Sequence, residues 1–242
     1  MRKGRATATF FMVLLTVIVT SVTIFYDKGF AQAGDEIWVK RYNGPAKGDD
    51  FARAMAVDKS GNVYVTGESL GSGTYRDYAT IKYSSSGNQL WAARYNGPGN
   101  RDDFARAVAV DASGNVYVTG YSKAPGAGYD YATIKYNSSG KQVWLKRYNG
   151  PGNGDDFASA LAVDGFGNVY VTGESPGSGT FRDFATIKYS SSGNQVWVKR
   201  YNGPGNGDDG AEAIAVDSGG HVCVSGYSKG PGTGYDYAVV KY

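Results

Sequence analysis

The four tryptophans of this 242-residue chain recur at a fixed spacing of 53 residues, at Trp38, Trp91, Trp144 and Trp197. The surrounding sequence recurs with them. Trp91 begins WAARYNGPGNRDDFARAVAVDASGNVYVTGYS, and Trp144 begins WLKRYNGPGNGDDFASALAVDGFGNVYVTGES. A constant period near 50 residues is typical of repeated supersecondary units that pack side by side. We therefore expect residues present in every copy to be structural, and we look for function where the copies differ.

Each repeat contains four short runs with the composition of β-strands. In the second repeat these runs are 105–111, 115–121, 130–136 and the tryptophan run 91–95, named here a, b, c and d. Valine, tyrosine and threonine alternate with period two in run b, which is typical of a strand. Glycine-rich turns such as Asp-x-x-Gly-Asn connect the runs as tight hairpins. Four antiparallel strands per repeat predict a propeller blade, whereas a solenoid would need parallel strands.

The boundaries of the repeat predict how the propeller closes. The repeats begin with a lone d run and end with runs a, b and c, so there are four runs of each kind. We predict an all-β propeller of four four-stranded blades over 34–242, in which 36–43 completes the last blade and removes its exposed edge. The repeat units are 38–90, 91–143, 144–196 and 197–242. The alanines of run a offer small side chains to a narrow centre.

The first 33 residues lie outside the repeat and predict a secretory signal peptide. Three basic residues within 1–5 precede an uncharged run, 10–26, and an Ala-Gln-Ala cleavage site at 31–33. An uncleaved membrane anchor is the alternative. The segment holds four of the 25 Lys and Arg and one of the 22 Asp and Glu, so 21 of each remain. A balanced chain does not favour nucleic acid as a partner, and we expect a secreted, periplasmic or cell-surface bacterial protein.

The sequence DDFARAVAVDASGNVYVTGYS, followed by DYATIKYNSSGKQVW, resembles the SBBP β-propeller repeat of secreted bacterial proteins. The resemblance covers residues 36–242. It implies a propeller fold, secretion, and use as a scaffold or binding module, and it implies no catalytic residues. The family's name refers to seven-bladed propellers, whereas this chain has material for four. The Gly-x-x-x-Trp turn also resembles quinoprotein propellers, but no other feature supports a quinone cofactor.

The loops between runs b and c alternate between odd and even repeats, so the underlying period is 106 residues. Glutamate and arginine in the first and third repeats replace two tyrosines in the second and fourth. The alternating residues are Glu68, Arg76, Tyr121, Tyr129, Glu174, Arg182, Tyr227 and Tyr235. Because b–c and d–a loops share one end of a meander blade, we expect these residues on one face. The alternation indicates either a recent duplication, since loops tolerate variation, or a twofold binding face.

This loop face predicts a non-enzymatic binding or structural module. Tyrosine-rich loops with Gly, Asn and Asp suit carbohydrate or protein contacts. The alternative is a carbohydrate-active enzyme, a lyase or glycoside hydrolase, with Glu68 and Glu174 as its best acids. The chain contains no H-E-x-x-H or phosphate-loop motif. We expect a monomer, while pairing of blade edges between chains remains open.

Paired acids end every d–a loop, next to the innermost strand. Two unit charges at ~6 Å repel by about 3 kcal/mol at an effective dielectric of 20, so something must offset them. A cation such as Ca²⁺ is one hypothesis, with the second acid of each pair as its ligand: Asp50, Asp103, Asp156 and Asp209. Pairing with arginine or backbone N–H groups is the other. The aspartates of the Asp-x-x-Gly-Asn turns are expected to bind their own turn.

Overall fold

The computed structural model of the protein describes residues 34–126 and 128–242, so the signal-peptide prediction for 1–33 lies outside the described residues. The chain divides into two compact units, Met1–Lys40 and Arg41–Tyr242. All fifteen strands of the described residues lie in the second unit, and these residues contain no helix, hence none that could cross a membrane. The all-β prediction is confirmed.

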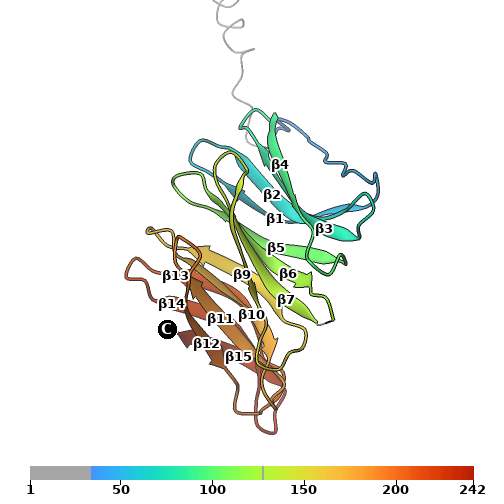
Figure 1. The fold of residues 1–242 in the computed structure, drawn as a ribbon. Coiled ribbons are helices and arrows are strands. Elements are labelled where there is room, and N and C mark those ends of the chain that lie inside the picture. The colour runs from blue at the N-terminus through green and yellow to red at the C-terminus, as the bar shows by residue number, and fades with distance from the viewer. Residues whose placement is uncertain (1–33, 127) are drawn as a thin grey trace, which may run out of the picture. The chain divides into compact units, whose positions relative to one another are not determined.

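The strands form four antiparallel meanders, which follow the chain order (Figure 1). The first sheet is β1(Asp50–Val57), β2(Val63–Leu70), β3(Arg76–Tyr83) and β4(Gln89–Tyr95). The second is β5(Asp103–Val110), β6(Val116–Lys123), β7(Tyr129–Tyr136) and β8(Gln142–Tyr148). The third is β9(Phe157–Val163), β10(Val169–Pro176), β11(Arg182–Tyr189) and β12(Gln195–Tyr201). The last has three strands, β13(Gly210–Val216), β14(Val222–Lys229) and β15(Tyr235–Lys241).

The Asp-x-x-Gly-Asn turns bind their own backbone, as predicted. Asp111 Oδ1 accepts hydrogen bonds from the N–H groups of Ser113 and Asn115, and its Oδ2 accepts one from the Tyr117 hydroxyl. These bonds lower the pKa of Asp111 against the opposing effect of burial. Gly114 adopts a φ of 77°, a conformation that glycine reaches without steric cost. The turn therefore fixes the hairpin and orients a buried tyrosine at the same time.

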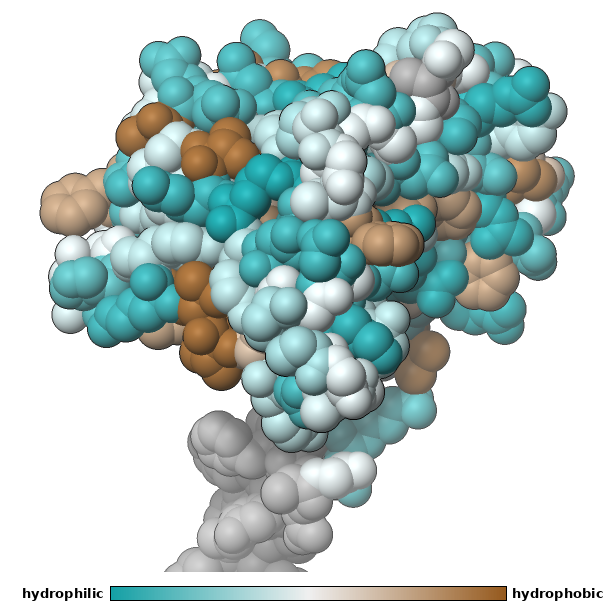
Figure 2. All heavy atoms as spheres, turned by 90° about the horizontal axis from the view of Figure 1, so that it is seen from below, coloured by the Kyte–Doolittle hydropathy of each residue, from teal (hydrophilic) through white to brown (hydrophobic). Residues whose placement is uncertain are grey.

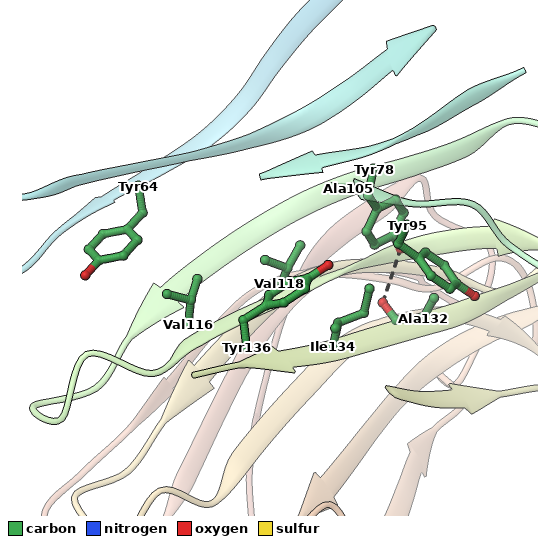
Figure 3. Packing of buried hydrophobic residues seen from close by; sticks show 9 residues of the cluster. All are labelled: Tyr64, Tyr78, Tyr95, Ala105, Val116, Val118, Ala132, Ile134 and Tyr136. Carbon is green, nitrogen blue, oxygen red and sulfur yellow. Dashed lines mark hydrogen bonds between the residues drawn. The ribbon is translucent and has the colours of Figure 1, made fainter. Parts of the chain in front are cut away.

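Aromatic side chains fill the space between neighbouring sheets. Tyr78 of the first sheet is fully buried against Val118 and Ile134 of the second, and its hydroxyl donates a hydrogen bond to Ala132 O at 3.2 Å (Figure 3). Trp91 packs on Tyr136 of the next sheet, with ring centroids 6.3 Å apart. Tryptophan side chains therefore contribute aromatic area to the packing between sheets. On the face seen in Figure 2, hydrophobic side chains form separate patches within a largely hydrophilic surface.

The predicted closure of the ring is not seen among the described residues. Packing joins β1 to β5, β5 to β9 and β9 to β13, whereas β1 and β13 do not form a closely packed pair. Residues 35–44 form no strand, and the last sheet keeps three strands. A ring closes only if the angles between successive blades sum to a full turn. That sum depends on packing between sheets rather than on the strand count.

Candidate functional site

The paired acids of the d–a loops close those loops and join them to the neighbouring b–c loops. The second acid of each pair accepts a hydrogen bond from the N–H of the glycine six residues earlier, at 2.5–2.9 Å. The acids so engaged are Asp50, Asp103, Asp156 and Asp209. The first acid binds the start of a c strand, as where Asp155 Oδ1 accepts from Tyr129 N at 2.8 Å.

Backbone N–H groups therefore hold these carboxylates, as the second hypothesis for the paired acids expected. The four carboxylates do not come together in one cluster. Among residues 34–126 and 128–242, no group of three or more His, Cys, Asp and Glu side chains could hold a metal ion. Burial raises the pKa of Asp103 to about 6, although the Gly97 N–H bond opposes the shift. Its side chain is part of a buried loop joint, and the Ca²⁺ hypothesis gains no geometric support.

The glutamates of the first and third sheets form ion pairs on the predicted face. Glu68 is 1% exposed and accepts hydrogen bonds from Arg53, and Arg76 lies 3.9 Å away. Glu174 pairs with Arg182 at 2.5 Å and accepts a hydrogen bond from the Tyr227 hydroxyl at 3.2 Å. Burial raises the pKa of Glu174, and the charge of Arg182 opposes that rise.

The tyrosines of the second and fourth sheets stack edge to face on the same side of the blades. Tyr121 and Tyr129 have ring centroids 5.3 Å apart at 83°, and Tyr227 and Tyr235 are 5.3 Å apart at 82°. Arg106 donates a hydrogen bond to the Tyr121 hydroxyl. The eight alternating residues thus form four matched pairs, glutamate with arginine or tyrosine with tyrosine, one pair per sheet.

A cavity of about 530 Å³ opens where the innermost strands approach each other, and we call it the axial cavity. Three of the alternating residues line it, namely Tyr121, Glu174 and Tyr227. The other lining side chains come mainly from one position of each innermost strand: Arg53, Arg106, Ser159 and Glu212. All lining residues belong to the Arg41–Tyr242 unit.

These four innermost-strand residues were not predicted, because each occupies the x of an Ala-x-Ala motif interpreted as a small-residue lining. The register between a and b strands shifts at this position, for example between Ala105 and Ala107. Such a β-bulge leaves one residue unpaired and re-aims its side chain. The available signal was the variation itself, since the sequence reads Arg, Arg, Ser and Glu between otherwise constant alanines.

The two walls of the axial cavity differ in charge. Arg53 and Arg106 lie on β1 and β5, while Glu174 and Glu212 lie on β10 and β13. Phe157, on β9, packs on Tyr121 with ring centroids 4.7 Å apart at 81°. The cavity therefore combines aromatic surface with hydrogen-bond donors on one side and acceptors on the other. This composition suits a polar ligand that has a flat apolar face.

His221 and Cys223, the only histidine and cysteine of the chain, are not part of this cavity. His221 Nδ1 lies 3.0 Å from Asp217 Oδ2, in the turn that opens β14. Cys223 is half-buried and free. The pair therefore lies outside the site, and its histidine contacts the turn aspartate of its own repeat.

The sequence matches the SBBP family, described as "Beta-propeller repeat", at residues 37–73, 90–126 and 143–179. A WD repeat-containing protein of Acanthamoeba polyphaga mimivirus is 29% identical over 132 residues, 47% of this chain and 9% of the viral protein. A protein of unknown function from Dyadobacter fermentans is similar in structure, with a TM-score of 0.46 and 10% identity, over 77% of this chain and 59% of that one. The periplasmic gluconolactonase of Pseudomonas aeruginosa gives a TM-score of 0.34 and 13% identity, over 79% and 73%.

Proposed function

The chain belongs to the SBBP β-propeller repeat family, and from this premise we propose that it is a secreted, non-enzymatic binding module. The ligand is a carbohydrate, held in the axial cavity and on the surrounding face of b–c and d–a loops. The observation that carries the proposal is the convergence of Tyr121, Glu174 and Tyr227, from three different sheets, on one cavity of about 530 Å³. Ligand sites are commonly cavities of this size with a few convergent polar groups.

The chemistry of the cavity supports a sugar. Tyr121 and Phe157 offer aromatic surface to the apolar face of a pyranose ring. Arg106 donates hydrogen bonds, while Glu212 accepts them, so both sides of a sugar hydroxyl can be satisfied. A protein surface could use the same groups, but a concave site of limited volume favours a small, polyhydroxylated ligand.

A glycan array probed with the purified protein, followed by calorimetry with the strongest hit, tests this proposal. Tyr121→Ala and Arg106→Ala should each weaken binding at least tenfold, which corresponds to about 1.4 kcal/mol. Phe166→Ala is the matched control, because this aromatic residue is 84% exposed in an a–b turn and does not line the cavity. Binding that is unchanged in both cavity variants, or an array without any hit, would refute the proposal.

A glycoside hydrolase is the second candidate, because two carboxylates in unequal environments line the same cavity. Burial raises the pKa of Glu174, as a general acid requires, whereas Glu212 is exposed. The release of reducing sugar from a bound glycan distinguishes the candidates. A hydrolase should lose its turnover in Glu174→Gln while still binding the glycan. No release by the native protein, at concentrations that saturate binding, leaves the binding module as the function.

A further inference from the structure

The last sheet has three strands where the other three sheets have four, and the sequence of a d strand occurs once more, before the first sheet. In the third sheet, β12 pairs with β11 so that Tyr201 faces Phe184 and Lys199 faces Thr186. The tryptophan-to-tyrosine sequence of β12, WVKRY, recurs without change at residues 38–42. Those residues form no strand, and within residues 34–126 and 128–242 no strand pairs with the outer edge of β15.

The arginine of each d strand binds a serine and an aspartate of its own sheet. Arg147 donates to Ser122 Oγ at 2.6 Å and forms an ion pair with Asp130 at 2.9 Å. Arg94 and Arg200 make the same contacts, and their ion pairs measure 3.0 and 2.9 Å. The three arginines contact sheets one, two and three in turn. This serine–arginine–aspartate contact is therefore part of a complete blade.

In the last sheet, the corresponding serine and aspartate are Ser228 and Asp236, and neither contacts an arginine among the described residues. Ser228 is 5% exposed, and its buried Oγ has no hydrogen-bond partner in the described part of the chain. Asp236 accepts a hydrogen bond from Thr233 Oγ1 at 3.3 Å and forms no ion pair there. A buried hydroxyl without a partner destabilises the fold, because its desolvation is not compensated. Arg41, the equivalent of Arg94, is exposed.

Tyr42, the last residue of this repeated sequence, contacts the first sheet rather than the last. Tyr42 accepts a hydrogen bond from Arg94 of the first sheet at 3.3 Å. In the same way, Tyr95 accepts one from Arg147 of the sheet that follows its own. Tyr42 thus occupies the place of a d-strand tyrosine preceding the first sheet. Because β1 and β13 do not form a closely packed pair, Tyr42 lies on a different terminal sheet from β15.

The two ends also expose complementary halves of the inter-sheet packing. Tyr237 of β15 is 101% exposed, whereas the equivalent Tyr78, Tyr131 and Phe184 are at most 1% exposed. At the other end, Met55 and Val57 of β1 are 63% and 54% exposed. The same junction, aromatic on one side and aliphatic on the other, is formed three times within the chain.

We propose that two copies of this chain join head to tail into a ring of eight blades, in which residues 37–42 of each copy form the fourth strand of the other copy's last sheet. Arg41 then reaches Ser228 and Asp236 of the partner subunit, and Tyr237 donates to Ala79 O of the partner subunit. Head-to-tail contacts generate rings when the rotation closes. Eight blades fall within the usual range of four to eight, whereas three copies would give twelve.

The mass of the purified protein in solution, measured by light scattering, tests the ring. We expect the mass of two chains, and a shift to that of one chain in Arg41→Glu. Asp236→Arg should dissociate the ring in the same way, and combining both substitutions should restore it. Lys141→Glu, which changes an exposed charge in a c–d turn, is the control and should leave two chains. A native mass of one chain, or of more than two, overturns the proposal.

Disulfide trapping tests the register of residues 37–42 against β15. It also distinguishes pairing with the same chain from pairing with a second copy. The register of the other sheets places Lys40 opposite Val239, so Lys40→Cys with Val239→Cys should give a two-chain band on non-reducing gels. Each single variant, which retains Cys223, controls for random oxidation. Lys40→Cys with Lys241→Cys is two residues out of register and should cross-link several-fold more slowly. A link within one chain, or no link, overturns the proposal.

Discussion

The packing between blades and the lining of the axial cavity are built from the same strands, yet the repeats copy them differently. Between blades, the tryptophan of strand d packs each time on the tyrosine at the end of run c in the next blade. Trp91–Tyr136, Trp144–Tyr189 and Trp197–Tyr242 have ring centroids 5.9–6.3 Å apart. In the axial cavity, Arg53, Arg106, Ser159 and Glu212 share one position and have three different chemistries.

The difference separates two kinds of demand on the sequence. Every blade must pack on its neighbour in the same way, so a change in one copy costs stability. A cavity on the axis receives one side chain from each blade, and four identical side chains would give it only one chemistry. Glu68 and Glu174 alternate with Tyr121 and Tyr227 at the end of strand b, next to the cavity. This alternation also gives different blades different side chains near the cavity. Substitutions in the packing between blades should therefore mainly lower the free energy of unfolding. Substitutions in the lining of the axial cavity should mainly weaken ligand binding.

The largest effect is expected for Tyr131→Ala, in the packing between blades. Tyr131 is 1% exposed, stacks on Tyr148, and donates a hydrogen bond to Ala185 O at 3.3 Å. Removing a buried aromatic side chain costs about 3–5 kcal/mol, which urea unfolding at fixed protein concentration will measure. Tyr131→Phe should cost only about 1 kcal/mol, since Phe184 holds the same place in the third sheet. Equal losses in the two variants would contradict this account.

An intermediate effect on stability is expected from the titration of Asp103, the buried aspartate of a d–a loop. Burial raises the pKa of Asp103 to about 6, whereas a carboxyl of an unfolded chain titrates near 4. The folded protein binds the extra proton between these values, so stability should increase as the pH falls from 7 to about 5. The gain over this pH range is about 1 kcal/mol. Urea unfolding as a function of pH measures it.

The matched variant for this pH dependence is Asp103→Asn, which can still accept the Gly97 N–H bond. It should flatten the stability profile between pH 4 and 6. Below pH 4 the direction reverses in both proteins, because hydrogen bonds lower the pKa of the turn aspartates Asp58, Asp111 and Asp164. A native profile that rises from pH 5 to 7, or a variant profile that keeps the native slope, would exclude Asp103 as the source.

The strands and the position of the loop face could be predicted from the sequence because they depend on local patterns. The expected run 105–111 appears as β5(Asp103–Val110), and the expected run 115–121 appears as β6(Val116–Lys123), shifted toward the C-terminus. Three of the eight alternating residues, Tyr121, Glu174 and Tyr227, line one cavity, and strand order in a meander follows from hairpin turns alone. Repetition made each prediction testable four times within one chain.

The cavity lining and the open ring could not be predicted, because both depend on relations between strands. The bulge that re-aims Arg106 appears only in the register between β5 and β6. Whether 36–43 closes a ring depends on the angle between sheets, which sums many packing contacts. The Ala-x-Ala motif in the sequence indicates neither the register between two strands nor the angle between two sheets. The paired acids had two interpretations for the same reason, and loop geometry favoured the backbone N–H groups.

The smallest effect on stability is expected for Arg106→Gln, and this prediction sharpens the comparison because a second arginine of the same blade serves as its reference. Arg106 is only half-buried and faces the cavity, so its loss should change the free energy of unfolding by less than about 0.5 kcal/mol. Arg147→Gln breaks the ion pair with the buried Asp130, and should cost about 3 kcal/mol. If Arg106→Gln destabilises the protein as much as Arg147→Gln, the variable position is structural, and the repeats diverge there for a reason other than ligand binding.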